Sequence, residues 1–332
     1  MKYLRATVLA LACTGCSGAG DGSGAAEARE ITGTLIVANK RGASLSRVDL
    51  ASGRETDRVR TCENPHELTV SPDNEHVLVA CYSGTQVQAF AIDEFEPAFE
   101  IDLGAEARVH SAQWFADDRI LAGAEGRGSA FLIELKEGEE PGLTETGMGG
   151  EGPHMVAVND AGTMAWGTII SAGTVVRYDL VQGIEAMRRA VGDQIEGLAL
   201  SPDGDTVWVS SNTADRVYRL DALSLELVAT IHVGDVPIRI AAHPGGEFVV
   251  TSNFGTGDLS VIEVATNTVT RTIPVSGSSE AAQVTLVFSP DGERLYVAET
   301  ANDEIAEIDF ASGEVLRRLP SGPGGDGLAV ID

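Results

Sequence analysis

Three histidines stand at a regular interval in the first half of the chain. His66, His110 and His154 follow one another at spacings of 44 residues, and each begins or precedes a short apolar strand pattern. Imidazole is a common protein ligand of zinc, copper and iron, and three imidazoles with one carboxylate make an adequate metal-binding set. The spacing therefore suggests a metal site, provided that the fold brings the three side chains together.

The strand patterns that carry these histidines belong to a repeat. Three segments contain Ser-Pro-Asp between apolar runs, LTVSPDNEHVLVA, LALSPDGDTVWVS and LVFSPDGERLYVA, and three degenerate copies fit between them in register. Pro and Gly at these points predict a tight turn between two strands. Each copy holds about four short strands in about 43 residues, which is typical of a β-propeller blade. The anchor residues of the six copies are Ser71, Phe115, Asn159, Ser201, His243 and Ser289.

The two ends of the repeat region complete each other. Residues 34–60 supply the second, third and fourth strands of a blade, and residues 325–331 supply a first strand. The chain therefore predicts an all-β fold: a seven-bladed β-propeller with four-stranded blades, in which the C-terminal strand closes a composite blade. We expect this domain to occupy residues 33–332, and no segment shows the sustained 3.6-residue apolar period of a helix.

One residue per blade is expected at the rim of the central channel, five positions before each anchor, where the innermost strand starts. Two interpretations stay open for this ring. His66, His110 and His154, completed by Asp326 or Glu196, could hold a divalent transition metal such as zinc, copper or iron. The ring could equally be a hydrated, polar channel mouth without any cofactor, and the sequence slightly favours this second interpretation. In blade order the rim residues are His66, His110, His154, Glu196, Ile238 with Arg239 beside it, Val284 and Asp326.

Further candidates lie in loops that open on the same face. A carboxylate such as Glu125 or Glu196 could act as a general base, and Arg239 or Lys40 could hold an anionic group of a substrate. Solvent exposure or turn capping is the alternative role for each loop residue. The candidates for ligand binding are Tyr82, Asn212, Asn253 and Glu299.

The N-terminus has the features of an export signal. Lys2 and Arg5 precede the apolar run ATVLALA, which is too short to span a membrane stably. The sequence Thr14-Gly15-Cys16-Ser17 resembles the cleavage site of bacterial lipoproteins, and the resemblance implies a signal peptide over residues 1–16 and a lipid on Cys16. Lipidation of Cys13 and a plain secretory signal are the alternatives. Residues 17–32 are expected to be a flexible linker rich in Gly, Ser and Ala.

Two further cysteines and the net charge limit the possible partners. Cys62 and Cys81 form an even pair, and export to an oxidising compartment makes them candidates for a disulfide; the alternative is a mixed Cys/His metal site. The net charge of −27 and the lack of Lys or Arg runs make nucleic acid a poor partner. No phosphate-binding loop, serine-hydrolase elbow or haem-attachment motif is present.

The repeats resemble those of YVTN-type seven-bladed β-propellers, exported proteins with Ser-Pro-Asp-Gly turns, over residues 33–332. The pieces ANKRG, NPHEL, GAEGRG, GPHMV, IEGLA and GGDGLA are similar to pieces of one uncharacterised subgroup, which implies a shared polar pocket.

Since propellers host many functions, two hypotheses about the function of this chain follow. The first is a lipoprotein of the bacterial cell envelope, lipid-anchored at the outer membrane or periplasmic face, that binds a small ligand or an envelope protein at the rim. The alternative is a metal-dependent hydrolase (lactonase-like), lyase or oxidase that uses the three histidines.

Overall fold

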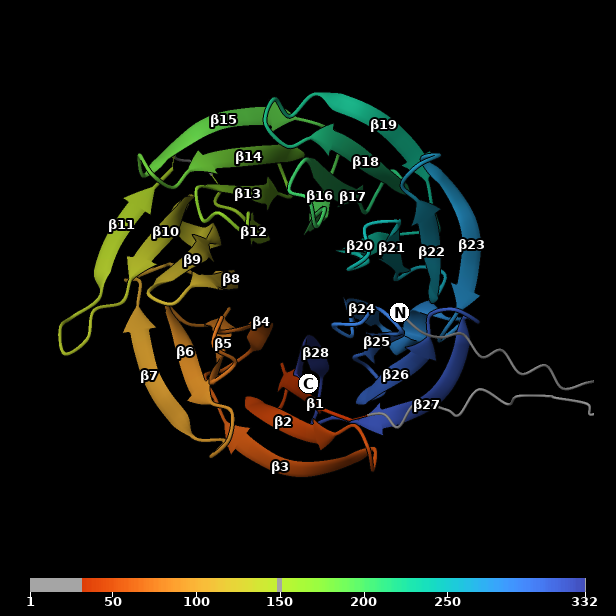
Figure 1. Ribbon diagram of the computed structural model, residues 1–332, viewed down its shortest axis with the longest axis horizontal. Helices are drawn as coiled ribbons and strands as arrows, with labels where there is room; N and C mark the ends of the chain where they lie inside the picture. The colour runs from red at the N-terminus through yellow and green to blue at the C-terminus, as the bar shows by residue number, and fades with distance from the viewer. Residues whose placement is uncertain (1–31, 148–150, 332) are drawn as a thin grey trace, which may run out of the picture. The chain divides into compact units, whose positions relative to one another are not determined.

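Seven four-stranded antiparallel sheets surround a central channel in the computed structural model, which describes residues 32–147 and 151–331 (Figure 1). The innermost strands β4, β8, β12, β16, β20, β24 and β28 face the channel, and the sheets follow one another around it as the blades of a propeller. The predicted seven-bladed β-propeller is therefore confirmed. We name the sheets blades A to G.

The bounds of the strands follow the predicted four-strand repeat. Blade A contains β28 (Gly325–Ile331), β1 (Thr34–Asn39), β2 (Ser44–Asp49) and β3 (Arg54–Arg60). Blade B contains β4 (Pro65–Val70), β5 (His76–Cys81), β6 (Gln86–Ala91) and β7 (Pro97–Asp102). Blade C contains β8 (Val109–Ala116), β9 (Arg119–Ala124), β10 (Ser129–Glu134) and β11 (Gly142–Thr146). Blade D contains β12 (Val156–Val158), β13 (Met164–Ile169), β14 (Thr174–Asp179) and β15 (Ile184–Ala190).

The remaining blades have the same arrangement. Blade E contains β16 (Ile195–Leu200), β17 (Thr206–Ser211), β18 (Arg216–Asp221) and β19 (Leu227–His232). Blade F contains β20 (Pro237–Ala242), β21 (Phe248–Asn253), β22 (Asp258–Glu263) and β23 (Thr268–Pro274). Blade G contains β24 (Gln283–Phe288), β25 (Arg294–Glu299), β26 (Glu304–Asp309) and β27 (Glu314–Pro320). The described residues also include two 3₁₀ turns, η1 (Glu125–Arg127) and η2 (Ser279–Ala281).

Hydrogen bonds explain why Ser-Pro-Asp recurs between the first and second strands. In blade B the backbone N–H of His76 donates to Ser71 Oγ at 2.9 Å, and that of Glu75 donates to Asp73 Oδ1 at 3.0 Å. The serines of blades E and G receive the equivalent bond from Thr206 and Arg294, each at 2.9 Å. The motif therefore caps a turn by satisfying backbone donors.

The C-terminal strand closes the ring as predicted. β28 pairs antiparallel with β1, with Leu35 opposite Val330 and Val37 opposite Leu328. Apolar side chains fill the spaces between neighbouring blades, as in the cluster that joins Leu78 of blade B to Trp114 of blade C. The core is thus distributed around the channel rather than gathered at one centre.

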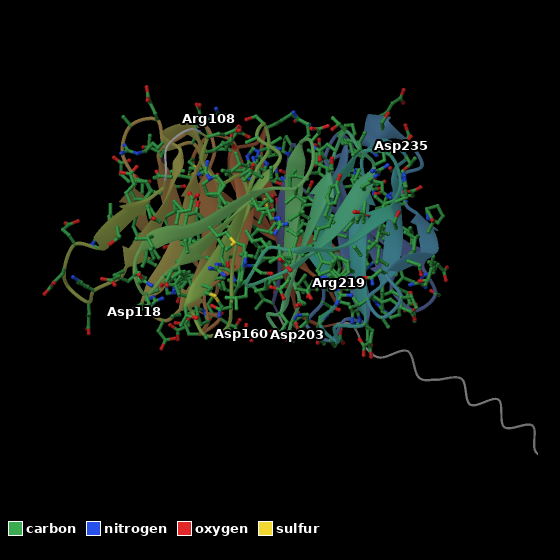
Figure 2. The ribbon with its side chains drawn as sticks, turned by 90° about the horizontal axis from the view of Figure 1, so that it is seen from above. Arg108, Asp118, Asp160, Asp203, Arg219 and Asp235 are labelled. Carbon is green, nitrogen blue, oxygen red and sulfur yellow. A yellow bond between two sulfur atoms is a disulfide. The ribbon has the colours of Figure 1, made fainter. Side chains whose placement is uncertain are left out.

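The propeller has two distinct faces (Figure 2). Arg108 and Asp235 lie on one of them, which we call the rim face because the innermost strands start there. Asp118, Asp160 and Asp203 lie on the opposite face, the turn face, which carries the turns between the first and second strands.

The predictions for the N-terminus fall on residues that the structure does not describe. The expected signal peptide, the lipidation site at Cys16 or Cys13 and the linker up to residue 31 lie outside the described residues. Within residues 32–147 and 151–331, no helix has the length and apolar character needed to cross a bilayer.

Candidate functional site

A β-bulge at the start of the innermost strand turns two consecutive residues toward the channel. In β4 the register passes from Pro65 opposite Cys81 to Leu68 opposite Val79, which leaves His66 and Glu67 outside the regular pairing. The same kind of shift occurs in β8, β16, β20, β24 and β28. Bulges re-aim side chains and are frequent beside functional sites. Here they place Glu67 and Arg239 in the channel beside the predicted rim residues.

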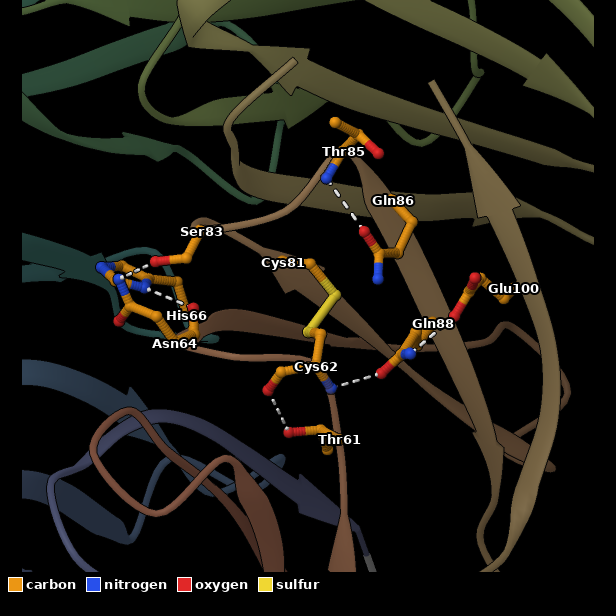
Figure 3. The surroundings of a disulfide bond; sticks show 10 residues. All are labelled: Thr61, Cys62, Asn64, His66, Cys81, Ser83, Thr85, Gln86, Gln88 and Glu100. Carbon is orange, nitrogen blue, oxygen red and sulfur yellow. Dashed lines mark hydrogen bonds between the residues drawn. A yellow bond between two sulfur atoms is a disulfide. The ribbon is translucent and has the colours of Figure 1, made fainter. Parts of the chain in front are cut away.

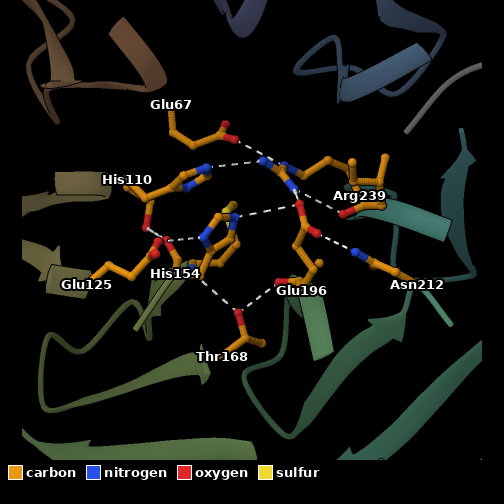
Figure 4. Close-up of polar contacts among 12 residues, drawn as sticks. Glu67, His110, Glu125, His154, Thr168, Glu196, Asn212 and Arg239 are labelled. Carbon is orange, nitrogen blue, oxygen red and sulfur yellow. Dashed lines mark hydrogen bonds and ion pairs between the residues drawn. The ribbon is translucent and has the colours of Figure 1, made fainter. Parts of the chain in front are cut away.

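A buried arginine joins blades on opposite sides of the channel (Figure 4). Arg239 of β20 donates through Nε to Glu67 Oε1 of β4 at 3.0 Å and through Nη1 to Glu196 Oε1 of β16 at 2.5 Å. Arg239 is 5% exposed and Glu196 is 9% exposed. Burial alone would lower the pKa of Arg239, but the charges of Glu67 and Glu196 outweigh it and raise the pKa, so the arginine is a permanent cation at this site.

His154 lies between two carboxylates. Its Nδ1 is 2.8 Å from Glu125 Oε2, and its Nε2 is 3.5 Å from Glu196 Oε1. Burial would lower the pKa of His154, but the hydrogen bonds to Glu125 and Glu196 outweigh it and raise the pKa above the usual 6.5. Burial would raise the pKa of Glu196, but the bond from His154 and the charge of Arg239 lower it to about 2. Both shifts favour an ion pair between His154 and Glu196.

The other two histidines are held neutral. The ring of His110 stacks on that of His154 with centroids 3.4 Å apart, and the ring of His66 lies 4.6 Å from that of His110. Burial lowers the pKa of His66 to about 3, helped by the charge of Lys40, and burial also holds the pKa of His110 well below 6.5. The pKa of His154 is thus shifted in the opposite direction from the pKa values of His66 and His110.

The tautomers of the neutral histidines follow from their neighbours. His110 Nε2 is 3.5 Å from Arg239 Nη2, which can only donate. This contact assigns the proton of His110 to Nδ1, and that buried N–H has no hydrogen-bond partner among the described residues. His66 Nδ1 lies 3.2 Å from the carbonyl oxygen of Asn64, which can only accept, so the Nε2 of His66 is an acceptor.

Asp326 and Lys40 form a second ion pair at the rim. Lys40 Nζ is 3.0 Å from Asp326 Oδ2, and Thr285 Oγ1 donates to Asp326 Oδ1 at 3.4 Å. Asp326 is fully buried. Its carboxylate is therefore neutralised by Lys40 instead of being left as a free ligand.

Tyr82 and Asn212 connect the buried network to the rim face. The Tyr82 hydroxyl donates to Glu125 Oε1 at 3.3 Å and accepts from Arg108, whose guanidinium lies 4.8 Å above the Tyr82 ring. The Tyr82 ring is 4.6 Å from that of His66. Asn212 donates to Glu196, and its Oδ1 has no hydrogen-bond partner among the described residues.

Two predicted ligand-binding residues are used elsewhere. Asn253 donates to Asp258 Oδ1 at 2.7 Å and to Ser260 Oγ at 3.0 Å, both within blade F. Glu299 accepts from Arg318 Nε at 2.6 Å within blade G and is 1% exposed. These bonds give both residues a role inside their own blades, so the structure does not bring them into the network.

The rim residues fit a metal ion poorly. Both nitrogens of His154 face carboxylates, and a guanidinium, which repels cations, stands beside His110. Ligand atoms of the three histidines do not converge within 4.8 Å of one another. In residues 32–147 and 151–331, the one group of three or more His, Cys, Asp or Glu that meets this distance is Asp73, Glu75 and His76 on the turn face.

A disulfide holds the segment that leads to His66 (Figure 3). Cys62 is bonded to Cys81, the last residue of β5, across a separation of 19 residues. The backbone N–H of Cys62 also donates to Gln88 Oε1 at 2.8 Å. With both sulfur atoms in this bond, they do not add to the ligands around the histidines.

Comparisons with known proteins agree with this fold. A segment of 130 residues, 38% of the chain, is 31% identical to the seven-bladed beta-propeller protein Rv1057 of Mycobacterium tuberculosis and spans 32% of that protein's length. The chain is a seven-bladed β-propeller protein. The propeller is also similar to Protein NirF of Stutzerimonas stutzeri, with 22% identity over 301 residues that cover 85% of this chain and 76% of NirF.

A solved structure extends the likeness to nearly the whole propeller. The hydrazine synthase of Kuenenia stuttgartiensis superposes with a TM-score of 0.73 at 17% identity, covering 84% of this chain and 93% of that chain. At this identity the likeness concerns the fold alone. No family model matches the chain.

Glu67 binds Arg239 in the channel, but the sequence pattern did not single it out. It follows His66 directly, and Arg239 stands at the same second position in blade F. A polar residue directly after the rim position could therefore have pointed to Glu67. This signal can be used only when the β-bulge of the innermost strand is known.

Proposed function

We propose that this propeller binds a small polar ligand at the rim of its channel, through the network around Arg239 and the three histidines. The observation that carries the proposal is the buried N–H of His110, which has no hydrogen-bond partner among the described residues although charged groups surround it. A buried polar atom without a partner costs about 1–3 kcal/mol. Such an atom beside a buried network of ion pairs indicates a place where a ligand supplies the hydrogen-bond partner that the protein lacks.

The groups around the network indicate the chemistry of the ligand. Its carboxylates already contact cations, since Glu67 and Glu196 share Arg239, and Asp326 pairs with Lys40. What is left over is a donor on His110 and acceptors on His66 and Asn212. This complement favours an uncharged or zwitterionic molecule with both donors and acceptors. The alternative partner is a polar segment of an envelope protein.

A thermal-shift experiment tests the proposal. Fractions of a small-molecule extract from the host cell are added to the wild type, to His110→Phe and to the control His232→Ala, which removes an exposed histidine of the outermost strand β19. We expect one fraction to raise the melting temperature of the wild type and the control but not of His110→Phe, because a ligand stabilises the state that it binds. Equal shifts in all three proteins, or no shift in any of them, would contradict ligand binding at the rim.

A metal-dependent hydrolase, lyase or oxidase has less support. Neutral imidazoles at His66 and His110 are competent metal ligands, but Arg239 and Lys40 place two cations beside them. The two candidate general bases, Glu196 and Glu125, already contact His154. No catalytic step therefore follows from these residues.

We also propose that the protein is exported and anchored by a lipid on Cys16. The N-terminal pattern supports this proposal, and the Cys62–Cys81 disulfide suits an oxidising compartment. Growth with labelled palmitate should label the wild type and Cys13→Ser but not Cys16→Ser, which should move to the soluble envelope fraction. Label retained by Cys16→Ser would reject this site.

A further inference from the structure

Arginine side chains bridge most neighbouring blades near the turn face. Each guanidinium reaches the main chain just after the third strand of the next blade, and some stack on an aromatic ring there, such as Arg47 at 4.4 Å from the Phe95 centroid and Arg271 at 5.1 Å from that of Phe310. Among the described residues there are five bridges of this kind: Arg47 to Ile92 and Asp93, Arg177 to Leu223, Arg219 to Val264, Arg271 to Phe310 and Ala311, and Arg317 to Leu50.

The bridging arginine comes from one of two equivalent positions. Arg47, Arg177 and Arg219 are the fourth residues of third strands. Arg271 and Arg317 lie on fourth strands, directly opposite that position. A guanidinium can therefore reach the neighbouring turn from either strand.

Blade B has no arginine at either position. The fourth residue of β6 is Ala89, and Phe99 of β7 lies opposite it. The whole segment 61–107 contains neither Lys nor Arg, against ten Asp or Glu. The Phe99 ring packs instead against Trp114 of blade C, with centroids 5.7 Å apart. Among the described residues, blade B therefore has no guanidinium that could bridge to the turn after β10 of blade C.

A pocket of about 410 Å³ lies at this place between blades B and C. It adjoins Leu135 and Lys136, the first residues after β10, and at this place five other blades offer carbonyl groups to an arginine. The turn that follows β10 has seven residues, against four or five in the other blades, and it projects outward in Figure 1 between β10 and β11. Phe99 contributes an aromatic surface, and five carboxylates line the pocket: Glu100, Asp117, Asp118, Glu137 and Glu139.

We infer that this pocket receives an arginine side chain of a partner protein, in the place where other blades use an arginine of their own. A guanidinium can stack on Phe99 while donating to carboxylates such as Asp117 and Asp118. Five carboxylates against Lys136 make the lining strongly acidic, which matches a cationic group and steers its approach. The five internal bridges show that the neighbouring turns of this fold accept a guanidinium.

A peptide titration tests the inference. The probe is an acetylated, amidated Gly-Arg-Gly peptide, and its control carries citrulline, a neutral urea of similar shape, in place of arginine. The readout is the NMR backbone spectrum of the purified protein. We expect the arginine peptide to shift resonances of residues 99–101 and 135–141 and to bind at least about tenfold more tightly than the citrulline peptide.

Variants of the pocket make the test specific. Phe99→Arg installs an arginine at the position of Arg271 and Arg317 and should abolish peptide binding by filling the pocket. Asp117→Asn with Asp118→Asn should weaken binding without changing the fold, and the control Asp160→Asn, on the turn of blade D, should not. Equal affinity for the two peptides, unchanged binding by the Asp117 and Asp118 variant, or displacement of the peptide by low millimolar Ca²⁺, which would indicate a metal-cation site, would each overturn the inference.

Discussion

At the scale of single residues, three histidines in equivalent positions have been given different electrostatic states. Two carboxylates contact His154 and raise its pKa, while burial lowers the pKa of His66 and of His110. The pKa of a rim histidine therefore depends more on the residues that contact it than on its position in the repeat.

The neutral state of His66 predicts a pH-dependent stability. Its pKa is about 3 in the folded protein against 6.5 for the free side chain, so the unfolded chain binds the extra proton as the pH falls from 6.5. Stability that is present at neutral pH is thus lost on acidification, by roughly 2–3 kcal/mol for His66 between pH 6.5 and 4.5. Urea unfolding of the wild type and of His66→Gln at pH 7, 6, 5 and 4.5 measures the difference.

The variant should show a shallower fall in the free energy of unfolding than the wild type, since His110 still contributes. His232→Gln, on the exposed surface, serves as the control and should follow the wild type. The same slope for His66→Gln and the wild type would mean that His66 is not held neutral by burial.

Sequence reasoning reached most of this site but not its charge states. The repeat period placed His66, His110, His154 and Glu196 around one ring, and the structure brings them together with Arg239. The sequence did not distinguish Asn253 and Glu299, which form hydrogen bonds within their own blades, from the residues of the channel. A residue at the end of a strand can face either a neighbouring turn or the channel. Whether a ligand or a metal binds at the ring stays a prediction.

At the scale of the elements, the bulge of the innermost strand decides what reaches the channel. The repeat predicted where each strand starts, but a bulge inserts a second channel-facing residue that no apolar alternation reveals. In blades A and E this second residue is glycine. A Cβ on Gly327 would lie 1.9 Å from the carbonyl oxygen of His66, so the backbones of blades A and B touch there.

Gly327→Ala should therefore destabilise the protein on the order of 3 kcal/mol through overpacking, because the clash is with main chain that cannot rotate away. Gly142→Ala is the matched control, since a Cβ there meets its nearest atom at 3.5 Å. Thermal melting should show a clear drop for the first variant and little change for the second. A Gly327→Ala protein with the melting temperature of the wild type would show that the close approach of these strands is relaxed in solution.

At the scale of the whole molecule, stability depends on closing the ring. β28 covers β1, whose central residues Leu35, Ile36 and Val37 are fully buried. Deleting residues 325–332 would expose this edge and open the contacts on both sides of blade A, so we expect loss of a cooperative thermal transition.

A rearranged chain provides the control for this deletion. Ile331 lies opposite Thr34 in the antiparallel pair, so residues 325–331 placed before Thr34 through an Asn-Gly turn should pair as they do in the native order. Recovery of cooperative melting would confirm that β28 acts through closure. Cooperative melting of the deleted chain itself at an unchanged temperature would show that the composite blade is dispensable.

The central claim is that the rim around Arg239 and His110 holds a small organic ligand. Native mass spectrometry of the soluble form, beginning after Cys16 and purified from its host, tests it most directly. We predict a near-stoichiometric organic adduct, released on denaturation and absent from Arg239→Met and His110→Phe, with no metal mass. An adduct that is a transition metal lost in His110→Ala would contradict the claim, as would a bare protein mass that no host extract increases.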